Sequence, residues 1–251
     1  QSFLTGVNSA YNFIDLDGTN EYIDCGDINE IDGASALSIS AWIKCDVTSG
    51  AHVIVSKYSS SSVRTELIIS SNVLYMAFGA TNGNFSFTST DWNHVAMVFD
   101  GSGTGNTGRL KIYLNGENQT LSYTGTIGTT TPDTGTNVLK IGNRTSHHFD
   151  GAMGQVSIFN KSLSATEVSA IYTAGRHSNL LHSYSDNLVG YWAMSALDGK
   201  TGLSDVGDGT IYDRSGNSNH GTATNTESAD LKSSPNAEPN GYAKGDTNRS
   251  T

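Results

Sequence analysis

Four oxygen-bearing side chains recur at alternate positions near the end of the chain. They are Asp213, Ser215, Asn217 and Asn219. Carboxylate, hydroxyl and amide oxygens, supplemented by backbone carbonyls and water, are the ligand set that Ca²⁺ prefers. The segment is not an EF-hand, because its glycine stands at the fourth position and no Glu closes it. Two interpretations stay open: a structural calcium site, or an Asx turn whose side chains hydrogen-bond to nearby backbone.

A second set of side chains has the chemistry of sugar recognition. Carbohydrate sites combine an aromatic platform with a few Asn, Asp or Arg groups that form directed hydrogen bonds. Residues of this kind, placed in loops or on one face of a sheet, are Tyr58, Arg64, Tyr75, Asn143 and Arg144. Two tryptophans, Trp42 and Trp92, are expected in the core instead. The sequence therefore predicts a ligand set for glycans.

The overall composition excludes several classes of function. The 251 residues carry 14 Lys and Arg against 24 Asp and Glu, a formal net charge of −10. Binding to a phosphate backbone needs clustered cations, so we expect no nucleic-acid partner. No apolar run approaches the ~20 residues that span a bilayer, so we expect no membrane insertion. The 28 glycines are typical of many tight turns between short strands.

Strand patterns recur about every ten residues along the first two thirds of the chain, where β-branched and apolar residues alternate with polar ones and turn residues fill the gaps. The predicted strands cover residues 11–16, 20–25, 37–45, 52–57, 64–70, 73–79, 84–88, 93–100, 109–115, 119–124, 137–142 and 152–160. Short strands at such even spacing are typical of an all-β sandwich.

Two local patterns predict a particular turn and the start of a particular helix. Asn115-Gly116 is the strongest short hairpin signal, and it follows the alternating strand 109–115. Ser164 and Glu167 form a capping box, which begins a helix that Gly175 can end. The segment Gly103–Gly108 matches GxGxxG literally, but a strand follows it where a nucleotide site needs a helix, so we expect a flexible hairpin loop.

Cys25 and Cys45 each lie in a predicted strand. They would form a disulfide if their Cα atoms were close enough, and otherwise serve as two small buried hydrophobes, which is the interpretation we favour.

Four motifs, in this order along the chain, resemble the laminin-G-like jelly rolls of the concanavalin A-like lectin and glucanase class. They are Phe13–Ile23, Leu37–Lys44, the strand pair Trp92–Gly116, and Phe149–Ser164. The resemblance covers residues 10–175. It implies a two-sheet antiparallel β-sandwich followed by a short helix. It also implies a structural calcium, although Gly154-Gln155 stands where relatives carry Asp-Glu, so one expected ligand is missing.

The resemblance and changes in composition near residues 177 and 226 divide the chain into three parts. Residues 1–176 form the jelly roll. Residues 177–225 either fold back onto it, which we favour, or begin a truncated second domain. Residues 226–251 are polar and form an extended arm or a flexible tail. The middle part, with its DxSGNxNHG segment, is similar to tails of structural proteins from marine bacteriophages.

Glycoside hydrolysis is the main enzymatic alternative, because laminarinase-type enzymes share this fold. They carry two carboxylates on one strand, and two carboxylates flanking the scissile bond are the usual requirement. Glu30-Ile31-Asp32 begins such a pattern, but no second Glu follows. A GxSxG nucleophile elbow is also missing from the sequence. We therefore predict that the chain is not an enzyme.

Two non-enzymatic functions follow from the resemblance. The first is a structural protein of a virion or cell surface, acting in assembly or attachment, with other subunits, copies of itself and cell-surface glycans as partners. The alternative is a secreted carbohydrate-binding module of a bacterial adhesin or of an enzyme that degrades polysaccharides. Both place the protein on a virion, on a cell surface or outside the cell.

Overall fold

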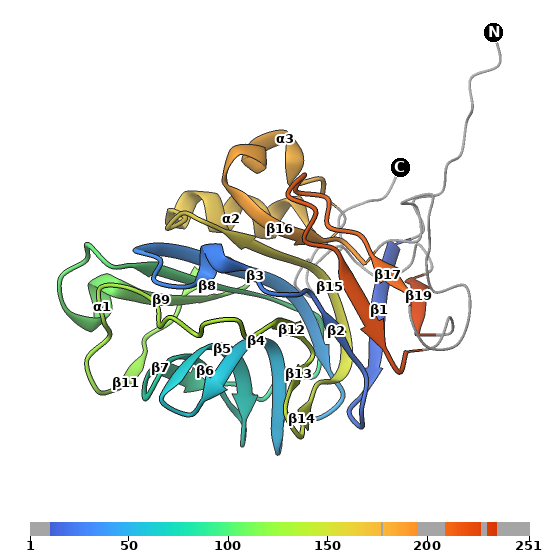
Figure 1. Ribbon diagram of the computed structural model, residues 1–251, viewed down its shortest axis with the longest axis horizontal. Helices are drawn as coiled ribbons and strands as arrows, with labels where there is room; N and C mark the ends of the chain where they lie inside the picture. Colours follow the sequence, from blue (N-terminus) through green and yellow to red (C-terminus); the bar gives the residue numbers. More distant parts are fainter. Residues whose placement is uncertain (1–10, 177, 195–208, 227–229, 235–251) are drawn as a thin grey trace, which may run out of the picture.

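Alternating apolar residues build most of the chain into two antiparallel sheets packed face to face, as a computed structural model shows (Figure 1). The structure describes residues 11–176, 178–194, 209–226 and 230–234. The expected β-sandwich is confirmed.

Sheet A runs in the order β10-β9-β8-β3-β15-β1-β19, and β16 also pairs with β15. Its strands are β1 Tyr11–Asp17, β3 Ala36–Cys45, β8 Asn93–Asp100, β9 Leu110–Leu114, β10 Glu117–Asn118, β15 Asp150–Phe159, β16 Leu188–Trp192 and β19 Leu231–Ser234.

Sheet B runs in the order β11-β7-β6-β5-β4-β12-β2-β18-β17. Its strands are β2 Tyr22–Asp24, β4 Ala51–Ser60, β5 Val63–Ser70, β6 Val73–Phe78, β7 Thr81–Ser86, β11 Ser122–Thr124, β12 Leu139–Ile141, β17 Thr210–Ile211 and β18 Gly221–Thr224. A separate two-stranded hairpin consists of β13 Asn143–Arg144 and β14 His147–His148.

The helices in the described residues are short. They are the 3₁₀ turns η1 Asn29–Ile31 and η2 Ser185–Asn187, and the α-helices α1 Gly105–Arg109, α2 Ala165–Ala174 and α3 Leu181–Tyr184. None of the described helices is long and apolar enough to cross a membrane.

The local sequence signals explain several of these boundaries. β9 turns into β10 through Asn115 and Gly116, whose φ angles of 52° and 81° are those of a two-residue hairpin turn. Before α2, the Ser164 side chain accepts from the backbone N–H of Glu167 and the Glu167 carboxylate accepts from that of Ser164. Both predictions are confirmed. The Gly103–Gly108 segment is corrected, since it contains α1 rather than only a flexible loop.

The main core fills the space between the two sheets. Both cysteines are buried in it and neither is in a disulfide, so the interpretation as small hydrophobes is confirmed.

Trp42 is buried, as expected. Trp92 is not a core residue, because it is only half-buried and holds the Arg176 guanidinium 4.3 Å above its ring. A tryptophan just before a strand can cover its apolar ring with a cation, through such a cation–π contact, instead of with core side chains.

Helices cover the outer face of sheet A. Leu163, Val168 and Ile171 pack with Phe159 and Tyr113 into a second, smaller core.

Under α2, the ring of His94 lies 5.3 Å from that of Trp42 and its Nε2 lies 2.7 Å from the Ser40 hydroxyl oxygen. Burial lowers the pKa of His94 to about 3, so this imidazole is neutral near pH 7.

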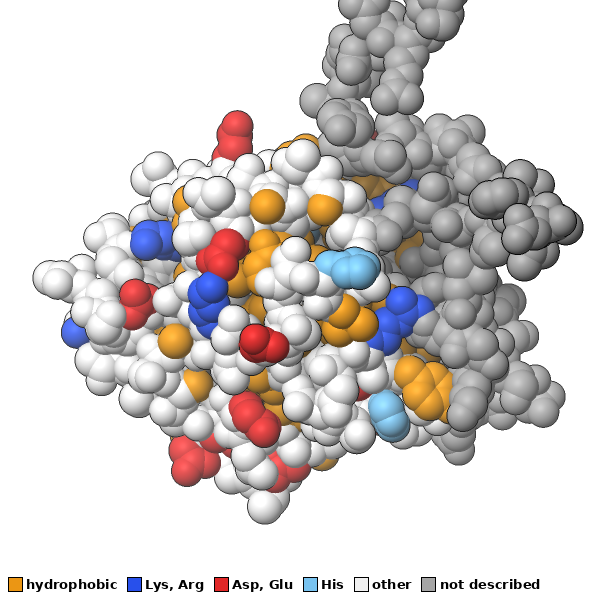
Figure 2. Space-filling model, turned by 90° about the horizontal axis from the view of Figure 1, so that it is seen from above, with side chains coloured by type: hydrophobic (Ala, Val, Ile, Leu, Met, Phe, Trp, Pro, Cys, Tyr) orange, Lys and Arg blue, Asp and Glu red, His pale blue; other side chains and the backbone are white. Residues whose placement is uncertain are grey.

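Figure 2 shows the molecule from the helix side. Among the described residues drawn there, acidic and basic side chains are interspersed and hydrophobic patches are small. Because α2 and α3 occupy this face of sheet A, the outer face of sheet B is the larger sheet surface left for a ligand (Figure 1).

The C-terminal strands pair with the jelly roll. β16 lies beside β15, β18 lies beside β2, and β19 lies beside β1. The described parts of 177–225 therefore extend both sheets. Of the predicted arm 226–251, the segment 231–234 is β19, while 235–251 lies outside the described residues.

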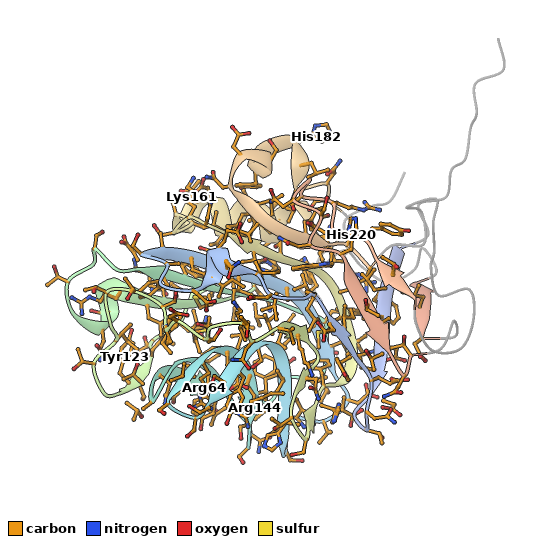
Figure 3. All side chains as sticks on the ribbon, in the orientation of Figure 1. Arg64, Tyr123, Arg144, Lys161, His182 and His220 are labelled. Carbon is orange, nitrogen blue, oxygen red and sulfur yellow. The ribbon has the colours of Figure 1, made fainter. Side chains whose placement is uncertain are left out.

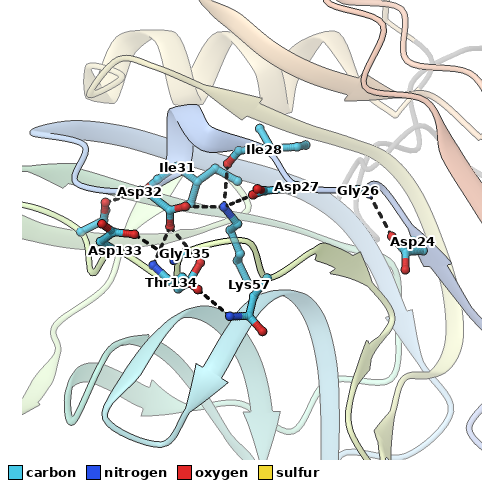
Figure 4. A network of polar contacts seen from close by, with 12 residues as sticks. Asp24, Gly26, Asp27, Ile28, Ile31, Asp32, Lys57, Asp133, Thr134 and Gly135 are labelled. Atoms are coloured by element: carbon cyan, nitrogen blue, oxygen red, sulfur yellow. Dashed lines mark hydrogen bonds and ion pairs between the residues drawn. The ribbon is translucent and has the colours of Figure 1, made fainter.

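A buried lysine ties the loops at one end of sheet B (Figure 4). The Lys57 side chain, on the inner face of β4, is fully buried. Its Nζ lies 2.8 Å from an Asp27 carboxylate oxygen, 3.0 Å from the Ile28 carbonyl oxygen, and also contacts Asp32. Asp32 in turn accepts hydrogen bonds from the backbone N–H and the hydroxyl of Thr134. Glu30 and Asp32 match only the beginning of a glycosidase motif, and Asp32 belongs to this structural network.

We predict that Lys57→Met lowers the free energy of unfolding by about 3 kcal/mol, because it leaves Asp32 nearly buried without its cation. Urea denaturation measures this. Lys111→Met, at a half-exposed position on sheet A, is the control and should change stability by no more than about 0.5 kcal/mol. Equal, small effects of the two substitutions would contradict the role given to Lys57.

Candidate functional site

The strand period places a set of polar and aromatic residues on the outer face of sheet B. Leu67 and Ile69 of β5 point into the core, so Arg64 and Glu66 on the same strand point outward. Directly opposite Arg64 on β4 is Tyr58. Since cross-strand partners share a face, the aromatic ring and the two charged groups lie together.

The β13–β14 hairpin packs against β4 and adds a second arginine. The Arg144 guanidinium carbon lies 5.1 Å from the centre of the Tyr58 ring, and its Nη1 donates to a Glu66 carboxylate oxygen at 2.9 Å. The same oxygen accepts from Arg64 Nη1 at 3.1 Å. We call Tyr58, Arg64, Glu66 and Arg144 the arginine cluster; Figure 3 shows its two arginines side by side.

Burial dominates the electrostatics of this cluster. The Glu66 side chain is fully buried, whereas those of Arg64 and Arg144 are 21% and 14% exposed. Desolvation raises the pKa of the Glu66 carboxyl, and the two guanidinium groups oppose that rise. The other carboxylate oxygen, Oε1, and Arg144 Nε are buried with no hydrogen-bond partner in the described structure. The cations are therefore held by a carboxylate that a ligand cannot reach.

Further polar groups continue along the same face. Tyr75 on β6 lies opposite Ile68 on one side and Asn84 on the other, and it is half-exposed. The Asn84 side-chain amide donates to Asn82 Oδ1 at 2.8 Å. An aromatic ring with side-chain amides on one side can stack on the C–H face of a sugar while the amides bond to its hydroxyls.

A groove of about 470 Å³ opens at the edge of this face. Its lining includes the hydroxyl-bearing residues Ser62, Thr81, Thr126 and Thr130, together with Gly79 and Asp133. Arg64 Nε donates to the Gly79 carbonyl oxygen at 3.1 Å, so the groove begins next to the arginine cluster. Its volume lies within the range of about 300–1,000 Å³ that is usual for small-ligand sites.

The structure brings together most, but not all, of the predicted glycan residues. Tyr58, Arg64 and Arg144 are in contact through Glu66 and the Tyr58 ring, and Tyr75 lies on the same face. Asn143 is different: it is buried, and its amide donates to the Thr145 carbonyl oxygen inside the hairpin. Its position supports the turn that carries Arg144.

Glu66, Asn82 and Asn84 belong to this face, but the sequence prediction omitted them. The signal for Glu66 was available, since Arg64 and Glu66 are two apart on a predicted strand and must share a face. The contact with Arg144 links positions 78 residues apart, and no local pattern indicates it.

The residues predicted to bind calcium also lie together, around the Asp213 carboxylate. Its Oδ1 accepts from the backbone N–H groups of Tyr191 and Ser215, both at 2.8 Å. Its Oδ2 accepts from the Ser215 hydroxyl at 2.7 Å and from the Asn219 N–H at 3.0 Å. A carboxylate has about four acceptor positions, so protein donors fill this one.

The two asparagines of this loop fasten it to β16. The Asn217 amide donates to the Leu188 carbonyl oxygen at 2.7 Å, and the Asn219 amide donates to that of Val189 at 2.8 Å. In this arrangement the loop is an Asx-type turn, and the oxygens of its Asp213 carboxylate accept hydrogen bonds from the protein's own donors. No group of three or more His, Cys, Asp or Glu in the described residues is arranged to hold a metal. Calcium binding stays a prediction, which thermal unfolding in calcium and in chelator tests.

The sheet order defines an antiparallel two-sheet β-sandwich. The family model described as the concanavalin A-like lectin/glucanases superfamily, of the laminin G type, matches residues 17–169. The chain belongs to this family. No curated protein sequence matches the chain.

One solved structure supports this fold, and a second shows a weaker similarity. One is titled a "putative carbohydrate binding protein" from Bacteroides ovatus; it is 18% identical, with a TM-score of 0.57 over 89% of this chain. This chain spans 63% of that protein's length. Another is domain 4 of an extracellular arabinanase from Geobacillus stearothermophilus in complex with arabinotriose, 16% identical, covering 57% of this chain and 69% of that one, with a TM-score of 0.45.

We predict that Asp213→Asn lowers the free energy of unfolding by about 3 kcal/mol, because an amide nitrogen would face donors that now bond to a carboxylate oxygen. Chemical denaturation in the presence of chelator measures this without any contribution from calcium. Asp91→Asn, at an exposed position, is the matched control. A loss below about 1 kcal/mol would contradict the central place of Asp213 in the loop.

Proposed function

We propose that this chain is a non-catalytic glycan-binding domain and that it binds sugars on the outer face of sheet B. The observation that carries the proposal is the arginine cluster beside Tyr75 and the hydroxyl-lined groove. Aromatic faces stack on the C–H surfaces of sugar rings, while guanidinium, amide and hydroxyl groups bond to sugar oxygens. This is the secreted carbohydrate-binding alternative that the sequence raised.

The fold supports binding by a rigid surface. Tyr58, Arg64 and Tyr75 stand on paired strands in the interior of sheet B. Arg144 is held by its own hairpin through the Asn143 amide. Side chains fixed in this way lose little conformational freedom when a ligand binds, which favours affinity.

The surroundings of two acidic residues, Glu66 and Asp32, support a non-catalytic function. Hydrolysis of a glycosidic bond needs two carboxyl groups that reach the substrate. Glu66, at the centre of the candidate face, is fully buried and paired with two arginines. Asp32 is occupied by Lys57 and Thr134.

Location and assembly are part of the proposal. A glycan-binding domain of this kind would act on a cell surface or outside the cell, without nucleic acid or membrane insertion. The function first expected, a structural protein of a virion or cell surface, is the weaker candidate, since the family match and the Bacteroides structure favour carbohydrate binding and give no sign of phage origin. Self-association and contacts with other surface subunits stay predictions.

We expect the folded chain to bind a subset of glycans on an array of bacterial, plant and animal saccharides. Tyr58→Ala and Tyr75→Ala should each weaken binding to the best ligand about tenfold or more, the loss of ~1.4 kcal/mol of stacking. Isothermal titration calorimetry measures the affinities.

The control for these variants is Tyr184→Ala, since Tyr184 packs against Phe159 on the helix side. It should leave the affinity unchanged, provided that melting curves show a folded protein. If no glycan binds the folded wild-type chain, or if the control loses affinity as much as the two variants do, the proposed function is wrong.

A further inference from the structure

The two guanidinium groups of the arginine cluster keep unused hydrogen-bonding capacity. Arg64 uses Nε for the Gly79 carbonyl and Nη1 for Glu66, and Arg144 uses Nη1 for Glu66. Neither Nη2 has a hydrogen-bond partner in the described part of the chain, and neither is among the buried atoms that lack one. Both Nη2 groups therefore keep contact with solvent, on side chains that are 21% and 14% exposed.

The protein fixes these groups before any ligand arrives. Glu66 binds both guanidinium groups through one oxygen, the Gly79 carbonyl orients Arg64, and the Tyr58 ring supports the plane of Arg144. Two converging guanidinium groups match the oxygens of a carboxylate or sulfate. An anion at this point would bond to the Nη2 groups without displacing Glu66.

The local charge favours an anion. Two guanidinium groups face one carboxylate in the cluster, and burial favours the neutral form of that carboxylate. The outward side chains of β4, β5 and β6 nearby are uncharged, namely Val53, Ser56, Ile68, Tyr75 and Ala77. The charged side chains next along the sheet are Lys140 on β12, opposite Ser56, and Asp24 on β2, opposite Lys140. A patch with excess positive charge stands out on a chain whose formal net charge is −10.

We propose that the sheet B site takes acidic saccharides, with a carboxylate or sulfate of the ligand bound between the Nη2 groups of Arg64 and Arg144. The neutral part of the saccharide extends toward Tyr75 or into the groove beyond Gly79, where hydroxyl side chains receive it. This inference rests on the proposed function, because it names the ligand class of the same site.

Matched polymers test the ligand class. Affinity electrophoresis or calorimetry compares polygalacturonate with its methyl ester, which has the same backbone without the charge, and dextran sulfate with dextran. We expect the charged member of at least one pair to bind about tenfold or more tightly than the neutral one, with affinity that falls as salt rises. The pair that shows this difference identifies carboxylate or sulfate as the anion.

Arginine variants test the site. Arg64→Gln leaves the Arg144–Glu66 pair in place and should lower the affinity for the charged polymer about tenfold, close to the affinity for the neutral one. Arg144→Lys keeps a charge near Glu66, so that the fold is retained, but loses the planar fork and should weaken binding as well. Lys161→Gln removes a cation from the helix side of the molecule (Figure 3) and should have no effect.

The outcomes separate this inference from the proposed function. Equal binding of charged and neutral polymers, abolished by Tyr58→Ala, would overturn the acidic preference and leave glycan binding standing. Preference for charged polymers that Lys161→Gln weakens as much as Arg64→Gln would also overturn it, since the attraction would then be nonspecific. Absence of binding to any saccharide would reject both.

Discussion

The two-residue period of the β-strand is the constraint on which the rest of this structure depends. Burying Leu67 and Ile69 of β5 between the sheets turns Arg64 and Glu66 to the outside. Glu66 is then covered by the β13–β14 hairpin, and a buried carboxylate is stable only with cations and donors around it. Arg64 and Arg144 meet that need, so the core packing and the candidate binding face arise from the same alternation.

Buried polar groups elsewhere in the molecule fasten loops. Lys57 joins the η1 segment to β4, and Asp213 joins the C-terminal loop to β16. Both sites hold residue types that suggest chemistry when only the sequence is seen, acidic pairs in one case and alternating oxygen ligands in the other. In the structure their acceptor positions are filled by the protein's own donors. The arginine cluster differs because donors remain open on its solvent side.

Local patterns predicted much of the fold. The Asn115-Gly116 turn, the Ser164–Glu167 capping box and the even strand spacing each depend on neighbours within a few residues, and each is confirmed. Trp92 is not in the core as expected, because the motif shared with the family does not reveal which end of a strand is open to solvent. The α1 turn escaped prediction because glycines favour loops and helix ends alike.

The candidate site was only partly visible in the sequence. Tyr58, Arg64 and Tyr75 could be assigned to a sheet face from alternation alone. Their proximity to Arg144 depends on the β13–β14 hairpin, which begins beyond residue 140 and packs onto β4. Long-range contacts of this kind follow from the topology of the whole sandwich, and no short motif encodes them.

The central claim is that the outer face of sheet B binds glycans, and the most direct measurement maps a bound saccharide on the protein. In a titration of ¹⁵N-labelled protein with oligogalacturonate, the account predicts amide shift changes concentrated in residues 56–68, 75–84 and 143–148. Changes concentrated in α2 and α3, or spread evenly over the molecule, would contradict it.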